Sequence, residues 1–302
     1  MEGATEIGFV PATGYRLYYE VYGRAGARGT VVGIHGGPGA THEYLHPLKD
    51  LVRRGYRVVL YDQLGCGRSD LPQDYSLFTL SHNVQEVEAL RRNLRLGPVH
   101  VLGSSYGGLL AIAYTLAHPR HVRSLTTTGG LASVPLATRE MLRLKRTLPR
   151  SVRAVMARYE RRKEYEHPEY QAAVNEFYRR FLIRILPMPG DVAYSLDHLS
   201  KPVYYSMNGP NEFTIVGSMR SIDLTPRLAS IRVPTLITGG RFDEVTPRVA
   251  ESLHRHIPGS EHVTFEASSH MPMWEERRRY IDTVAHFLDR AGGGSPRGRL
   301  TS

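Results

Sequence analysis

A serine lies between glycines in the stretch Gly103-Ser104-Ser105-Tyr106-Gly107, and its setting is that of a catalytic nucleophile. The stretch fits the pattern G-x-S-x-G, in which Ser105 takes the middle position. The apolar run HVL precedes it and the apolar run LLAIA follows it, so a strand is expected to turn sharply into a helix here. Glycines two positions on either side remove the Cβ atoms that would collide in such a turn. The pattern therefore predicts that the Ser105 hydroxyl lies at a helix N-terminus, where the helix dipole favours developing negative charge.

A serine hydroxyl is a weak nucleophile at neutral pH, so it needs a base, and the base needs a carboxylate that orients it. In proteins with this kind of serine, these groups follow later strands in the chain order Ser, Asp or Glu, His. Asp243 follows the run Thr235–Thr238, and His270 follows the run His262–Phe265. Both are then expected beyond the carboxyl ends of strands, where open α/β sheets bind ligands. We expect Ser105, Asp243 and His270 to form a catalytic triad. The carboxylates that stay open as alternatives are Asp62, whose Gly-rich loop favours a role in capping backbone amides, and Asp223.

The tetrahedral intermediate of acyl transfer carries an oxyanion that needs hydrogen-bond donors. One donor is expected to be the backbone N–H of Tyr106, the residue after the nucleophile. The second is expected from the loop HGGPG at residues 35–39, which directly follows the run Thr30–Ile34. Its glycines permit a close approach of the backbone, and we assign Gly37 as the donor.

Short β-branched runs alternate with helix-like segments and predict the elements that position these residues. Apolar residues recur at helical spacing in Asn83–Leu96, and Leu109–Ala117 is an apolar helix that ends before Pro119. This alternation predicts an α/β fold with a mostly parallel central sheet and helices on both of its faces. The expected strands are Thr30–Ile34, Arg57–Tyr61, Val99–Leu102, Ser124–Thr128, Thr235–Thr238 and His262–Phe265.

The rhythm of strand and helix stops between about residues 131 and 231, where the composition is helical and rich in arginine and tyrosine. We therefore expect a helical cap of residues 132–231, inserted into a core made of residues 1–131 and 232–291. Residues 292–302, GGGSPRGRLTS, are rich in glycine, serine and arginine and are expected to form a disordered tail.

The chain carries a formal net charge of +10, and only four of its 39 basic residues are lysine. A basic balance can indicate contact with nucleic acid or a membrane surface. No RNA-binding motif and no basic run with interleaved aromatics occurs, so neither partner is expected, and an arginine-favouring proteome is the simpler explanation. No apolar run approaches the roughly 20 residues of a membrane span, and no secretory signal is visible. The single cysteine, Cys66, excludes an internal disulfide. A cytoplasmic protein is the simplest interpretation.

Five motifs, taken together and in this order, resemble the proline iminopeptidase family of α/β-hydrolases. They are HGGPG (35–39), YDQLGCGRSD (61–70), GSSYGG (103–108), GGRFDEVTP (239–247) and SSHMPMWE (268–275). The segment MNGPNEF (207–213) is similar to the tricorn-interacting aminopeptidase branch of that family. The resemblance spans about residues 8 to 290. It implies an α/β-hydrolase fold with a helical cap and an enzyme that removes N-terminal residues, often proline, from short peptides.

The resemblance also implies roles for single residues. It implies the same triad and the same oxyanion donors as above, and it adds two glutamates that hold the α-ammonium group of the substrate, Glu212 and Glu244. Paired carboxylates suit the recognition of one positive charge at a fixed distance from the scissile carbonyl, and burial strengthens such pairing. The alternative is that both are ordinary solvated acids. Family members have tryptophan after the nucleophile, whereas this chain has Tyr106. A strict preference for proline and a broader preference for apolar N-terminal residues therefore both stay open.

The stretch His42-Glu43-Tyr44-Leu45-His46 matches H-E-x-x-H, a pattern of zinc proteases. That chemistry requires both histidines on one face of a continuous helix. Pro47 follows directly and disfavours helical geometry at His46, and no third ligand is signalled. We therefore expect no metal and no cofactor, and we interpret the stretch as the start of a helix that lines the entrance to the site.

Fold does not determine substrate, so other functions stay open beside a serine aminopeptidase. An esterase, a lactonase or an amino-acid amidase could use the same scaffold, and a non-catalytic ligand receptor could retain the pocket. The sequence leaves the oligomeric state open.

Overall fold

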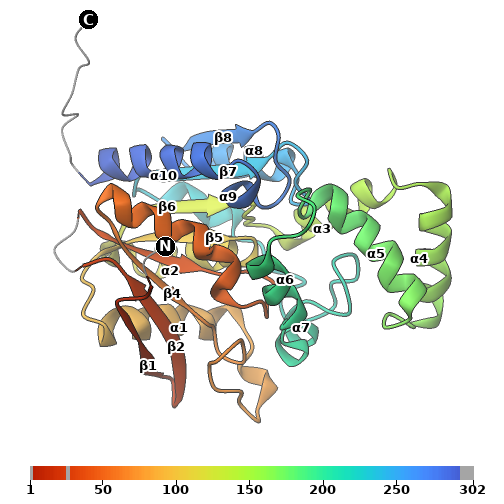
Figure 1. Ribbon diagram of the computed structural model, residues 1–302, viewed down its shortest axis with the longest axis horizontal. Coiled ribbons are helices and arrows are strands. Elements are labelled where there is room, and N and C mark those ends of the chain that lie inside the picture. Colours follow the sequence, from red (N-terminus) through yellow and green to blue (C-terminus); the bar gives the residue numbers. More distant parts are fainter. Residues whose placement is uncertain (1–2, 25–27, 293–302) are drawn as a thin grey trace, which may run out of the picture.

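The centre of the molecule is an eight-stranded sheet in a computed structural model that describes residues 3–24 and 28–292. Its strand order is β1-β2-β4-β3-β5-β6-β7-β8 (Figure 1). Strands β3 to β8 pair in parallel, and β1 and β2 extend one edge by antiparallel pairing. The strands are β1 (Glu6–Ala12), β2 (Tyr15–Tyr22), β3 (Thr30–Ile34), β4 (Arg57–Tyr61), β5 (Val99–Ser104), β6 (Val122–Thr128), β7 (Thr235–Gly240) and β8 (Glu261–Phe265).

All six predicted strands are confirmed, and β3 and β4 have the predicted bounds. The sequence analysis missed the hairpin of β1 and β2. Its turn is Thr13-Gly14, with φ values of 52° and 90°, which is the left-handed backbone of a type I′ turn. The hairpin places β2 beside β4 and brings Glu20 of β2 close to His42 in the segment after β3.

Neighbouring residues of the central strands point to opposite faces of the sheet, and each face has its own apolar core. Val31 and Val58 pack into the core shared with η1 (His42–Arg54) and α10 (Arg277–Ala291). Val32 and Val59 pack into the core shared with α1 (Leu80–Asn93), α2 (Tyr106–Ala117) and α8 (Pro247–His256). The expected α/β layering, with helices on both faces, is confirmed. The remaining short helices outside the cap segment are η2 (Tyr75–Leu77), η3 (Pro119–His121) and α9 (Pro272–Glu275).

The segment between β6 and β7 is helical, as expected. Figure 1 shows α4 and α5 projecting from the sheet at one end. These two helices pack around an apolar cluster of their own that includes Phe177 and Phe213. The helices of the segment are α3 (Val134–Lys145), α4 (Arg150–Arg162), α5 (Pro168–Phe181), α6 (Gly190–Asp197), α7 (Lys201–Met207) and η4 (Thr225–Ser230).

The H-E-x-x-H stretch lies in η1, a 3₁₀ helix that includes Pro47. The stretch starts a helix, as expected, but that helix continues through His46 and Pro47, and the rings of His42 and His46 lie 5.6 Å apart. A 3₁₀ helix tolerates this because its N–H groups bond three residues back, and the proline removes only one such bond.

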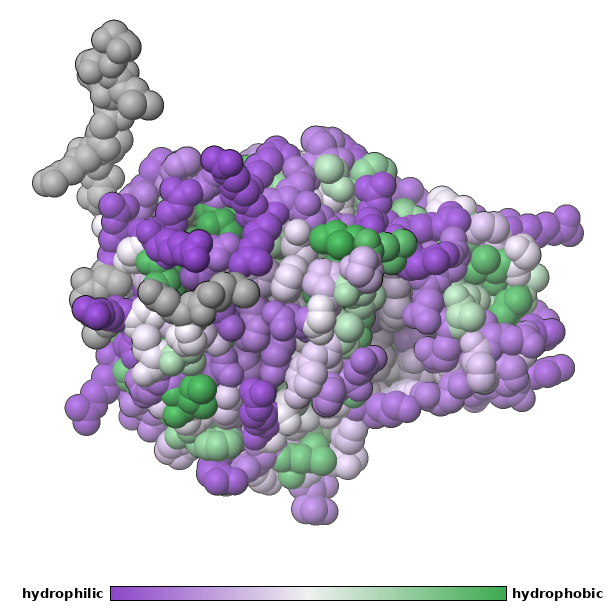
Figure 2. Space-filling view, in the orientation of Figure 1, coloured by the Kyte–Doolittle hydropathy of each residue, from purple (hydrophilic) through white to green (hydrophobic). Residues whose placement is uncertain are grey.

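Most of the surface visible in Figure 2 is hydrophilic, with isolated apolar side chains. Arginines at the surface pair with neighbouring acids, for example Arg290 with Glu261 and Arg241 with Glu266. Much of the basic charge is therefore balanced locally. Among the described residues, no helix is both long enough and apolar enough to cross a lipid bilayer. Of the predicted tail, Gly292 caps α10, and residues 293–302 lie outside the described residues.

Candidate active site

Ser105 lies at the junction of β5 and α2 with φ 57° and ψ −125°, a backbone conformation that is rare and strained for a residue with a side chain. The flanking glycines make this turn possible. A Cβ atom at Gly103 would lie 2.0 Å from the carbonyl oxygen of Gly107, and one at Gly107 would lie 2.1 Å from the carbonyl oxygen of Ile34. The predicted strand–turn–helix around the serine is confirmed.

His270 and Asp243 meet at the carboxyl ends of β8 and β7. The ring Nδ1 of His270 lies 2.6 Å from Asp243 Oδ1, which also accepts the backbone N–H of Val245 at 2.7 Å. Both side chains are buried. The alternative carboxylates have other partners: Asp62 accepts the backbone N–H groups of His42 and Arg68, and Asp223 accepts the hydroxyl of Ser133 and the N–H of Thr225. The expected capping role of Asp62 is thus confirmed.

Ser105 and His270 line one cavity of about 630 Å³. His270 Nε2 is buried and has no hydrogen bond to any described residue, Ser105 included. Catalytic hydrogen bonds are often long in unliganded enzymes and shorten when substrate binds. The structure therefore brings the pair Asp243–His270 together and places Ser105 in the same cavity, with the free ring nitrogen available to it.

The HGGPG loop lies directly against Ser105. A Cβ atom at Gly36 would lie 2.7 Å from the Cβ of Ser105 and 3.3 Å from the backbone nitrogen of Tyr106. The N–H of Gly36 donates to the hydroxyl of Tyr44 at 2.7 Å, which fixes the loop. Within the described residues, the N–H groups of Gly37 and Tyr106 have no acceptor. Both expected oxyanion donors are therefore free beside the serine.

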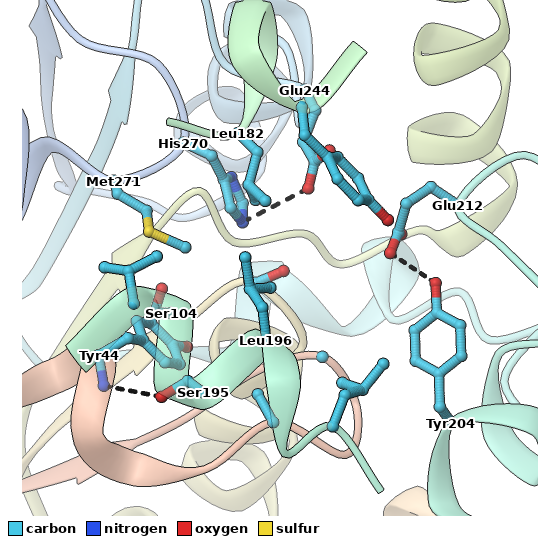
Figure 3. Close-up of a pocket in the computed structure, with 16 residues that line it drawn as sticks. Tyr44, Ser104, Leu182, Ser195, Leu196, Tyr204, Glu212, Glu244, His270 and Met271 are labelled. Carbon is cyan, nitrogen blue, oxygen red and sulfur yellow. Dashed lines mark hydrogen bonds and ion pairs between the residues drawn. The ribbon is translucent and has the colours of Figure 1, made fainter. Parts of the chain in front are cut away.

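Glu212 and Glu244 both line the cavity that holds Ser105 and His270 (Figure 3). Glu244 is buried, and its Oε1 lies 3.9 Å from His270 Nε2. Glu212 accepts the hydroxyl of Tyr204 at 2.5 Å. In the part of the chain that the structure describes, neither glutamate forms an ion pair with a lysine or an arginine. Glu244 is buried and Glu212 is half-buried, so neither is the fully solvated acid of the alternative interpretation.

Burial and mutual repulsion shift the acid–base equilibria of this cluster. Burial raises the pKa of Glu244 to about 8, and the neighbouring carboxylates of Glu212 and Asp243 add to the rise against the opposing effect of His270. Burial also raises the pKa of Glu212. Burial alone would lower the pKa of His270, but the surrounding carboxylates outweigh it and raise that pKa to about 9. An added positive charge would lower the pKa of all three groups, because it favours the carboxylates and disfavours the imidazolium.

The cap is hydrogen-bonded to the catalytic loops by a contact that sequence reasoning missed. The carbonyl oxygen of Phe181, the last residue of α5, accepts the N–H of Glu244 at 3.1 Å and the N–H of His270 at 3.2 Å. Tyr204 of α7, the donor to Glu212, was also missed. Nothing in the local sequence marks either residue, because each contact depends on how the cap packs on the core.

A second, smaller cavity adjoins the first. Its space of about 380 Å³ shares Gly37, Ser105, Glu212 and Glu244 with the larger cavity. Apolar side chains form most of its remaining wall: Leu131, Val134, Ala137, Met141, Ile215, Met219 and Val245. The serine and the two glutamates thus stand where two cavities meet. The buried hydroxyl of Tyr106 donates to Asn83 Oδ1 of α1 at 2.6 Å, so α1 fixes the side chain of the residue after the nucleophile.

Comparisons with known proteins agree with this geometry. Residues 29–277 match the family model described as alpha/beta hydrolase fold. The chain is 45% identical to the proline iminopeptidase of Saccharolobus solfataricus, over 94% of this chain and 92% of that one. It is 43% identical to the proline iminopeptidase of Thermoplasma volcanium, over 94% and 97% of the two chains. The solved proline iminopeptidase of Mycobacterium smegmatis is 32% identical and has a TM-score of 0.89, covering 95% of this chain and 99% of that one.

Proposed function

Because the chain belongs to the proline iminopeptidase family of α/β-hydrolases, we propose that its cavity binds the free N-terminus of a short peptide and releases the first residue, above all proline. The enzyme is a serine aminopeptidase, and it works through an aminoacyl-enzyme intermediate. Ser105 is the nucleophile, His270 is the base, and Asp243 orients the base. Gly37 and Tyr106 are the oxyanion donors.

One observation carries the proposal beyond a general serine hydrolase. Glu212 and Glu244 are enclosed beside Ser105, and within the described residues no lysine or arginine pairs with them. Burial raises the pKa of both carboxyl groups, so a ligand that brings a positive charge would stabilise their ionised form. The α-ammonium of a peptide is such a cation, and it belongs to the same residue as the carbonyl that Ser105 attacks, with only the Cα atom between them.

The reaction follows from the positions of these groups. Ser105 Oγ attacks the carbonyl carbon of the first residue while His270 Nε2 takes the hydroxyl proton. The oxyanion accepts hydrogen bonds from the N–H groups of Gly37 and Tyr106. The scissile C–N bond breaks, and the leaving amine takes the proton from His270. Water then attacks the aminoacyl ester by the same route, which frees the amino acid and Ser105.

Binding of the substrate also prepares the base. A histidine with a pKa near 9 is mostly protonated at neutral pH and cannot accept the serine proton. The positive charge of an ammonium group held by Glu212 and Glu244 disfavours the imidazolium beside it, so the pKa of His270 falls. A substrate with a free amine therefore produces the neutral base that its own cleavage requires.

The test is a panel of aminoacyl-naphthylamides, with proline and alanine first, each with a free or an acetylated amine. We expect cleavage of the free forms and loss of cleavage on acetylation. Glu212→Gln and Glu244→Gln should lower kcat/KM for free-amine substrates, and Glu251→Gln, which removes one exposed carboxylate on α8, is the matched control. Equal turnover of free and acetylated substrates would exclude amine recognition and favour an esterase, lactonase or amidase on the same scaffold.

A reactive serine can be tested independently of substrate choice. A fluorophosphonate should label the protein at Ser105, and Ser105→Ala should abolish both labelling and turnover. Labelling without turnover of any substrate would favour a ligand receptor. The division into a core of residues 1–131 and 232–291 and a cap of residues 132–231, the cytoplasmic location and the absence of a nucleic-acid partner remain predictions.

A further inference from the structure

A second cluster of ionisable side chains lies outside both cavities, where the H-E-x-x-H stretch meets the β1–β2 hairpin. His42 and His46 start η1, and Glu20 reaches them from β2. One donor atom from each of the three residues lies within 4.8 Å of the others. None of the three lines either active-site cavity. The serine mechanism therefore leaves this cluster unexplained.

Each histidine is oriented by an aspartate through its inner ring nitrogen. His42 Nδ1 lies 2.8 Å from Asp62 Oδ1, and His46 Nδ1 lies 2.9 Å from Asp191 Oδ2 on α6. Both Nε2 atoms are buried without a hydrogen bond to any described residue, and the His42 side chain is 0% exposed. Pairs of this kind, with a carboxylate on one nitrogen and the other nitrogen free, are typical of histidines that bind a metal.

The free nitrogens converge on one oxygen. His42 Nε2 lies 3.5 Å and His46 Nε2 lies 3.9 Å from Glu20 Oε2. Ligands at about 2.0–2.1 Å from a tetrahedral zinc ion lie about 3.3 Å from one another. The two distances to Glu20 Oε2 exceed this spacing by a few tenths of an ångström, and all three atoms lie within 4.8 Å of one another. The hydroxyls of Tyr18 and Tyr22 donate to Glu20, which keeps it ionised and fixes its direction.

We propose that Glu20, His42 and His46 form a binding site for a divalent transition-metal ion, with Zn²⁺ as the best fit. Two imidazoles and one carboxylate are ligands that zinc prefers, and water can take a fourth position. The role is structural, since the three residues line neither cavity. The ion would link β2 to the start of η1 and, through His46 and Asp191, to α6. Tyr44 of η1 and Leu196 of α6 both line the larger cavity, so this link would hold one of its walls in place.

The surrounding charges favour a dication. Two cationic side chains face the cluster: Arg68 Nη1 lies 3.5 Å from Glu20 Oε1, and the Lys49 ammonium lies 4.3 Å from the ring centre of Tyr22. Four carboxylates face them: Glu20, Glu43, Asp62 and Asp191. With neutral histidines, the cluster thus carries two uncompensated negative charges, and one divalent ion balances them. Protons on the two histidines are the competing occupants.

The experiment titrates the chelator-stripped full chain with Zn²⁺ in a calorimeter, in two buffers of different ionisation enthalpy at neutral pH. We expect about one ion per chain, a release of protons that the buffer dependence reveals, and a melting temperature about 5 °C higher at a hundredfold excess over Kd. His46→Ala and Glu20→Gln should weaken binding at least a hundredfold. Asp191→Asn, which keeps every ligand, should weaken it tenfold to a hundredfold.

The control is His121→Ala, in the other group of histidines near a carboxylate, Glu88, His118 and His121. It should bind as the unaltered chain does. Because His46 and Asp191 are partly exposed, their variants should remain folded, which circular dichroism checks. Unchanged affinity in His46→Ala and Asp191→Asn would overturn the proposal. So would a folded, unaltered chain that binds no Zn²⁺, or binding that His270→Ala alone abolishes, which would place the ion in the active site.

Discussion

Glu244→Gln is expected to change activity in opposite directions on two kinds of substrate. It removes a carboxylate that lies 3.9 Å from the ring nitrogen of His270 and that helps to bind the substrate amine. Cleavage of free-amine substrates should fall because half of the amine site is lost. Hydrolysis of an uncharged ester such as p-nitrophenyl acetate should instead become faster between about pH 8 and 9, because no ammonium is needed and the base loses its proton more easily.

The size of this second effect follows from the distance between the charges. Two unit charges about 4 Å apart interact with about 4 kcal/mol at an effective dielectric constant of about 20, which equals about three pKa units. The carboxyl group of Glu244 has a pKa of about 8, so it is ionised where His270, with a pKa of about 9, loses its proton. Three units is an upper limit, because water in the cavity screens the pair. Because the Glu244 carboxyl group is mostly protonated below its pKa of about 8, we expect the gain in ester rate to be largest between about pH 8 and 9, where the unaltered chain holds carboxylate and imidazolium together, and to be small at pH 7.

The assay is the pH dependence of kcat/KM for the ester, which reports the pKa of the base in the free enzyme. The neutral base appears as pH rises through this pKa, so a lower pKa moves the rising limb of the profile to lower pH. Glu251→Gln should leave that limb in place. If the limb of Glu244→Gln coincides with that of the unaltered chain or moves to higher pH, the carboxylate does not control the base and the reasoning fails.

Three further substitutions test other parts of the structure. Gly107→Ala should destabilise the protein by about 3 kcal/mol or more in urea unfolding, because its Cβ would meet the Ile34 carbonyl oxygen at 2.1 Å; a loss below about 1 kcal/mol would show that the turn can relax. Tyr204→Phe should lower kcat/KM for free-amine substrates about tenfold, because Glu212 loses a 2.5 Å hydrogen bond, and it should leave ester hydrolysis unchanged; equal losses on both substrates would contradict this role. Glu86 is fully buried, and burial raises its pKa from 4.5 to about 7, so the folded state favours the protonated form and stability falls as pH rises from about 4.5 to 7. Glu86→Gln should therefore gain about 2 kcal/mol relative to the unaltered chain between pH 5 and pH 8 in unfolding experiments, and a difference that does not vary with pH would refute the assignment.

The sheet and the strand–turn–helix around Ser105 could be predicted because their signals are local. Glycine and proline bound the β-branched runs, and the G-x-S-x-G pattern states the turn at Ser105 directly in the sequence. Asp243 could be ranked above Asp62 and Asp223 by its place after a strand, but the distance to His270 was needed to decide. The amine-binding role of the two glutamates came only from the family resemblance, because no local pattern links Glu212 to Glu244 across the cap.

The parts that were missed depend on contacts between distant segments. The hairpin of β1 and β2 was overlooked, although Thr13-Gly14 between aromatic-rich runs is a recognisable turn signal. Because the hairpin was not predicted, nothing placed Glu20 of β2 beside the histidines of H-E-x-x-H as a candidate third ligand. Pro47 was expected to disfavour helical geometry at His46, whereas the chain forms a 3₁₀ helix through both residues. Sequence patterns locate elements well, but they do not say which side chains the elements bring together.

The carbonyl oxygen of Phe181 has a consequence for how peptides enter and leave. Because this single atom holds the backbone of both Glu244 and His270, the end of α5 cannot swing away without releasing the acid–base machinery. The end of α5 and the two catalytic loops are therefore expected to move together or not at all during turnover.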